Sequence, residues 1–202
     1  MINDDLREEM ASLDALIDWA SPDDPAVAVA LAAPTAAKGW TVGDTLAHLA
    51  WTDLAGAIAC RAPDDFVARA RAVAVPAVET LPEVWPGARQ ELLAGLDRAQ
   101  AAGERLPWFS LPMGAASFAT ARLMEYWAHG QDIALALAVT REPTARLRNV
   151  CHIGVLTLGF SFAQHGLEAP SEPVRVELEA PDGSTWEWGD PAAANRVSGP
   201  AL

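Results

Sequence analysis

The chain has 202 residues, enough for one domain of generous size or for one domain plus part of another. Its 27 acidic residues outnumber 14 Lys and Arg, and the resulting net charge of −13 argues against general binding to DNA or RNA. Hydrophobic residues make up 51% of the chain, which excludes intrinsic disorder, but no stretch approaches the roughly 18–20 apolar residues of a membrane span. The acidic start and the two isolated cysteines, Cys60 and Cys151, predict a cytoplasmic protein with reduced thiols.

The first 170 residues show helical periodicity. In the first helix, Leu6, Met10, Leu13 and Ile17 recur at the spacing of one helix face. A capping arrangement of Thr41 and Asp44 marks the start of the second long helix, and Ser117 is a candidate cap for a later one. The predicted helices cover residues 4–20, 41–61, 64–75, 83–103, 117–139 and 144–165.

The remaining segments have other patterns. The loop at residues 106–114 is rich in large apolar side chains, so we expect it to fold over another part of the chain. Residues 174–179 and 185–188 alternate with period two around the turn sequence Pro-Asp-Gly-Ser, which predicts a β-hairpin. The prediction is a mainly α protein, an antiparallel four-helix bundle at residues 1–168 followed by a hairpin segment at 169–202.

Glu125 and His129 are the first candidates for chemistry. They lie four residues apart on one predicted helix, so a carboxylate and an imidazole project from the same face and can reach one ion. Asp132 shares that face and could orient His129 through its second ring nitrogen. Because the surrounding helix is apolar on most sides, the pair is expected to be buried, and a metal would offset the cost of burying it.

His48 is the natural third ligand, since it lies on another strongly apolar helix. Composition alone favours a core histidine that bonds to Asp44 or to a backbone carbonyl. His165 is explained by its position at a helix C-terminus, and His152 remains a candidate pocket residue.

Other chemistries have little support in the sequence. No nucleophile elbow, phosphate-binding loop, dinucleotide fingerprint or HExxH motif is present, and neither cysteine has a basic cluster beside it. Four tryptophans fit core packing or a pocket lining equally well: Trp40, Trp51, Trp108 and Trp127.

Two segments carry a family resemblance. Gly43-Asp44-Thr45-Leu46-Ala47-His48-Leu49-Ala50 and Ala121-Arg122-Leu123-Met124-Glu125-Tyr126-Trp127-Ala128-His129-Gly130-Gln131-Asp132 resemble the DinB-like metal-binding four-helix bundles. The closer likeness is to the mycothiol-dependent maleylpyruvate isomerase branch and to its relatives described only as metal-binding. The likeness covers residues 1 to about 168 and continues from Val174 into the start of a small α+β C-terminal domain, which similar proteins carry in longer form.

The resemblance implies a metal site made of His48, Glu125 and His129. Zinc is the usual metal of such families, and the donor set also suits nickel and other first-row ions. Mycothiol is the implied thiol cofactor, and a small molecule is the implied substrate. The resemblance places no residue in cofactor binding, and both a monomer and a homodimer fit the sequence.

Three functions stay open at this point. In the first, the thiol attacks an electrophilic substrate, where addition, rotation and elimination give isomerisation and addition alone gives S-transfer. In the second, the metal acts without a thiol, as in a lyase, cyclase or hydrolase. The third is a non-enzymatic metal-binding module. Arg122 could bind a substrate carboxylate or form a structural salt bridge, and the substrate itself is not predicted.

Overall fold

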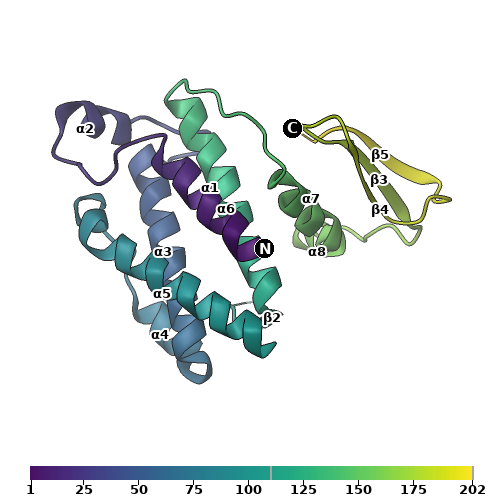
Figure 1. The fold of residues 1–202 in the computed structure, drawn as a ribbon, viewed down its shortest axis with the longest axis horizontal. Coiled ribbons are helices and arrows are strands. Elements are labelled where there is room, and N and C mark those ends of the chain that lie inside the picture. Colours follow the sequence, from purple (N-terminus) through teal and green to yellow (C-terminus); the bar gives the residue numbers. More distant parts are fainter. Residues whose placement is uncertain (110, 202) are drawn as a thin grey trace. The chain divides into compact units, whose positions relative to one another are not determined.

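The computed structural model describes residues 1–109 and 111–201, and the chain is mainly helical (Figure 1). Its contacts divide into two compact units, residues 1–141 and 142–202, which are described separately. The predicted domain boundary at 168/169 lies later than this division, because the two helices after residue 141 group with the strands. The assignment of residues 1–168 to a single bundle domain therefore stays a prediction.

The first unit is a helical bundle with a short connecting hairpin. Four long helices form it, and smaller helices occupy the connections between them. Its elements are α1 (Ile2–Asp14), α2 (Pro25–Leu31), α3 (Val42–Arg61), η1 (Pro63–Asp65), α4 (Phe66–Ala72), η2 (Val78–Thr80), α5 (Leu81–Ala102), β1 (Arg105–Leu106), β2 (Met113–Gly114) and α6 (Ala115–Ala136).

Helix α3 begins as the sequence predicts. The Thr41 hydroxyl accepts from the Asp44 backbone N–H at 3.1 Å, and the Asp44 carboxylate accepts from the Thr41 backbone N–H at 2.8 Å. These reciprocal bonds satisfy two donors that a helix start leaves without partners. Helix α6 begins earlier than predicted, because its N-cap is Gly114 and not Ser117.

Contacts between the long helices show the direction in which each helix runs relative to the others. Asp53 in α3 meets Arg122 in α6, whereas the later Gly56 lies against the earlier Phe118, so α3 and α6 are antiparallel. Helices α3 and α5 run in the same direction, since the connection at residues 62–80 crosses back along the bundle. The core of this unit is largely apolar, with Trp85, Tyr126, Phe66 and Phe118 among its largest fully buried side chains, but it also encloses buried charged residues.

The second unit combines two short helices with a three-stranded sheet. The predicted hairpin forms, and a third strand pairs in parallel with its first strand, giving the order β4-β3-β5. One helix was predicted where two form, because the chain departs from regular helix at Thr157. The elements are α7 (Leu147–Leu156), α8 (Leu158–Gln164), β3 (Val174–Glu179), β4 (Thr185–Trp188) and β5 (Asn195–Pro200). Within the described residues, no helix is long and apolar enough to cross a bilayer.

Candidate metal centre

Two helices of the first unit bring His48, Glu125 and His129 together. Nε2 of His48 lies 3.2 Å from Oε2 of Glu125, although the two residues are 77 positions apart in the chain. Nε2 of His129 lies 3.6 Å from the same oxygen, across one turn of α6. One ligand atom from each residue falls within 4.8 Å of the other two. The geometry therefore assembles the three side chains that the sequence comparison with DinB-like bundles singled out.

Two further side chains hold the imidazoles in place. Oδ2 of Asp132 lies 3.2 Å from Nδ1 of His129, the contact expected of a residue that orients this ring and leaves Nε2 facing the cluster. The indole of Trp40 stacks on His129, with ring centroids 5.9 Å apart and planes 21° from parallel. Trp40 also packs on His48 at a centroid distance of 5.1 Å, so it contacts both imidazoles.

The cluster perturbs the ionisation of its members. Burial alone would raise the pKa of Glu125, but hydrogen bonds with His129 and His48 outweigh burial and hold that pKa well below its usual range. The hydrogen bond with Glu125 raises the pKa of His129, against the opposing effect of burial, and Asp132 raises it further. Both shifts therefore favour the charged forms of Glu125 and His129 more than in the free side chains.

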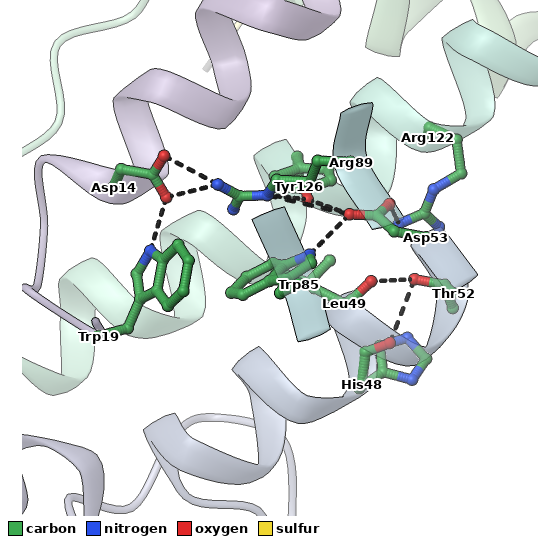
Figure 2. Close-up of polar contacts among 10 residues, drawn as sticks. All are labelled: Asp14, Trp19, His48, Leu49, Thr52, Asp53, Trp85, Arg89, Arg122 and Tyr126. Atoms are coloured by element: carbon green, nitrogen blue, oxygen red, sulfur yellow. Dashed lines mark hydrogen bonds and ion pairs between the residues drawn. The ribbon is translucent and has the colours of Figure 1, made fainter. Parts of the chain in front are cut away.

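A buried polar network joins the two helices that carry the candidate ligands, and Figure 2 shows this network together with His48. Asp53, which is fully buried in α3, accepts hydrogen bonds from Trp85 Nε1 at 2.8 Å, from Arg122 Nη2 at 3.1 Å and from the Tyr126 hydroxyl. Because Arg122 and Tyr126 flank Glu125 in sequence on α6, Asp53 links the helix of His48 to the helix of the other two candidate ligands.

The network continues to α1 through Arg89. Its Nε donates to the Tyr126 hydroxyl at 3.0 Å, and its Nη1 donates to both carboxylate oxygens of Asp14 at 2.9 and 2.8 Å. Arg89 also lies over the Trp85 ring, 3.9 Å from its centroid. The sequence reasoning did not identify Asp53 or Arg89, although a lone carboxylate within the apolar stretch of α3 was a signal for a buried pair.

Arg122 takes the structural one of the two roles that the sequence left open, and substrate binding by it stays a prediction. It forms the buried ion pair with Asp53, and it also lines a cavity of about 270 Å³ beside His48 and Glu125. Trp51 and Trp108 line the same cavity, whereas Trp40 borders a second cavity that His48 also lines. Trp127 borders neither of these two cavities.

The other candidates lie elsewhere. His152 accepts a hydrogen bond from Trp188 Nε1 at 3.1 Å in the second unit, and Nδ1 of His165 lies 2.8 Å from the Ser161 carbonyl, as a helix-end histidine can. Cys60 and Cys151 are free thiols whose pKa values burial raises, which opposes a nucleophilic role.

The first unit matches a known family model. The mycothiol maleylpyruvate isomerase N-terminal domain aligns with residues 6–134, a stretch that includes all three clustered side chains. The chain belongs to this family.

Two further comparisons extend the match. The chain is 42% identical over 217 aligned residues to an uncharacterised protein of Mycobacterium tuberculosis, found in two strains, and the alignment covers 98% of this chain and 80% of that protein. Crystal structures of the mycothiol-dependent maleylpyruvate isomerase and of a mutant of it superpose with a TM-score of 0.58 at 14% identity, covering 100% of this chain and 85% of theirs. These matches confirm the predicted DinB-like, mainly α fold.

Proposed function

We propose that this protein is a metal-dependent enzyme that uses a mycothiol-type thiol in the isomerisation or S-transfer of an electrophilic small molecule. The observation that carries the proposal is the convergence of three ligand atoms, from α3 and α6, within 4.8 Å of one another. The cavity beside His48 and Glu125 supports a role in chemistry rather than in folding alone. Membership of the mycothiol maleylpyruvate isomerase family supports the choice of thiol.

The donor set fits a divalent first-row cation. Two imidazole nitrogens and one carboxylate oxygen are ligands that zinc accepts, as do nickel and cobalt, and three protein ligands leave coordination positions open. When bound, such a cation supplies Lewis acidity that lowers the pKa of a thiol or of water at the site. We propose zinc as the resident metal.

The protein's own residues prepare this site in three ways. Asp132 holds the His129 ring with Nε2 toward the cluster, and Glu125 presents an ionised carboxylate. The Thr52 hydroxyl donates to the backbone carbonyl of His48 at 3.1 Å, which links the side chain of Thr52 to the backbone one turn earlier, at His48.

Metal analysis of protein purified without a histidine tag tests the ligand assignment. His48→Ala, Glu125→Ala and His129→Ala should each lose most of the bound metal, because each removes one of three ligands. His165→Ala is the matched control, since it deletes an imidazole outside the cluster and should retain the metal. Equal metal content in all four variants would refute the site.

Titration of mycothiol into cobalt-substituted protein tests the thiol. A new sulfur-to-cobalt charge-transfer band supports thiol chemistry at this site. Its absence at millimolar thiol, with cobalt still bound, would exclude the thiol and leave a metal-dependent lyase, cyclase or hydrolase. A protein that binds metal without turning over any electrophile would instead be a metal-binding module.

A further inference from the structure

Two polar contacts join helices α3 and α6 at neighbouring positions. Nε2 of His48 lies 3.2 Å from Oε2 of Glu125. Nη2 of Arg122 donates to Oδ1 of Asp53 at 3.1 Å. Because the helices are antiparallel, the later residue on α3 meets the earlier residue on α6. With a rise of about 1.5 Å per residue, the two contacts lie about 7.5 Å apart along α3 and about 4.5 Å apart along α6. A shift of α6 along α3 therefore changes both contacts together.

The contact made by Asp53 is the more buried of the two. The side chains of His48 and Glu125 are 28% and 30% exposed. Those of Arg122 and Asp53 are only 3% and 0% exposed. Asp53 also accepts from the hydroxyl of Tyr126, the residue directly after Glu125, and Figure 2 shows both of its partners on α6. Asp53 therefore holds α6 at positions on either side of a candidate ligand.

Apolar contacts between the same helices fix their relative position less sharply. Gly56 of α3 faces Phe118 of α6, and a contact of this kind has no preferred direction, so it tolerates a small rotation. A hydrogen bond weakens steeply when it is misaligned. Trp85 of α5 also donates to Asp53, at 2.8 Å, so the acceptor is itself held in place. The bonds of Asp53 therefore resist a rotation of α6 that the apolar contacts would allow.

We infer that Asp53 is a positioning residue of the candidate metal centre. Its bonds with Arg122 and Tyr126 fix the rotation and the axial position of α6 against α3. That position in turn sets the distance between His48 and Glu125. The inference rests on the proposed function for the metal, and it goes further by assigning the geometry of the site to a residue that is not itself a candidate ligand.

Cobalt titration of two matched variants tests the inference. Asp53→Asn and Asp14→Asn each replace a carboxylate of the same polar network by an amide, but Asp14 lies on α1 and bonds to Arg89 of α5. Asp53→Asn should raise the Kd for cobalt about tenfold or more and shift the visible absorption bands, which report ligand geometry. Asp14→Asn should leave the Kd and the bands unchanged. Equal changes in the two folded variants would overturn the inference, as would no change in Asp53→Asn.

Tyr126→Phe provides the test if Asp53→Asn does not fold. It removes one hydroxyl that bonds to Asp53, keeps the buried ring, and should raise the Kd for cobalt about threefold or more. In crystals of this variant without metal, the separation of His48 Nε2 from Glu125 Oε2 should increase by about 0.5 Å or more, a change that a site of this kind does not tolerate. Failure of the unmodified protein to bind cobalt would sink the proposed function. An unchanged separation in the metal-free variant would sink this inference, whether or not cobalt binds.

Discussion

Asp53 holds three donors from two other helices at a position without solvent access. Asp53→Asn should lower the free energy of unfolding by about 3–5 kcal/mol, because it leaves the buried Arg122 guanidinium without its counter-charge. Urea denaturation measures the loss. Asp65→Asn breaks an exposed pair with Arg69 and should change stability little. Similar midpoints for the two variants would show that the Asp53 network is not a structural requirement.

The raised pKa of His129 predicts how the affinity for a metal depends on pH. Its pKa is raised above 6.5, chiefly by the hydrogen bond with Glu125, and a metal requires the neutral ring. The affinity for cobalt should therefore fall as pH decreases through this raised pKa and reach a plateau above it. Asp132→Asn removes one of the groups that raise the pKa, so the midpoint should move to lower pH. A midpoint that does not move, measured by cobalt absorbance between pH 5 and 8, would contradict this cause.

Cys60 should react slowly. Burial raises the pKa of its thiol to about 11, so at pH 8 it holds roughly a hundredfold less thiolate than a thiol of pKa 9. Alkylation by iodoacetamide, followed by mass spectrometry, should be at least tenfold slower in the folded protein than in urea. Equal rates would show that this thiol is available as a nucleophile, and the need for an external thiol would weaken.

At the scale of elements, α3 and α5 lie in close contact where Gly95 faces Cys60. A Cβ added at Gly95 would lie 2.4 Å from Cys60 Cβ, so the helices would have to separate. Gly95→Ala should destabilise the protein by about 1–3 kcal/mol despite the better helix propensity of Ala. Gly87→Ala in the same helix meets nothing within 4 Å and should stabilise it by about 0.5–1 kcal/mol. Urea denaturation of both variants checks the opposite signs.

Local sequence signals predicted several elements well. The limits of α3 followed from the Thr41–Asp44 cap and the break before Pro63, and the β3–β4 hairpin followed from period-two alternation. The predictions failed where local signals were weak or where tertiary pairing decides. Helix α2 has only seven residues, and β5 pairs in parallel with β3 although β4 lies between them in the sequence, which no local pattern encodes.

At the scale of the whole molecule, the sequence predicted the α6 residues of the candidate site more firmly than it predicted His48. Helical periodicity alone placed Glu125, His129 and Asp132 on one face of α6. The convergence of His48 on them depends on how α3 packs against α6. The residues alone made His48 a candidate third ligand, and the family resemblance favoured that role over a core histidine. The Asp53 network escaped prediction for the same reason, since its partners lie on helices whose directions the sequence does not reveal.

A cation bound between α3 and α6 should stabilise the first unit as a whole. At a free zinc concentration a thousand times Kd, the free energy of unfolding should rise by about 4 kcal/mol, because zinc binds the folded site and not the unfolded chain. Thermal denaturation should show a rise in Tm with zinc but not with magnesium, which prefers oxygen ligands. His48→Ala should abolish the rise, and a persistent rise would mean that zinc binds elsewhere.

Helix α3 carries His48, Thr52, Asp53, Gly56 and Cys60, which serve the candidate ligand set, the buried ion pair and the contacts with α5 and α6. Deleting a single residue between His48 and Thr52 would turn the later residues by about 100° relative to His48, and would separate the candidate ligand from the buried ion pair and the helix contacts. Evolution can therefore exchange side chains along this segment but cannot change its length. Insertions and deletions among relatives should gather in the connections on either side, at residues 32–41 and 62–80.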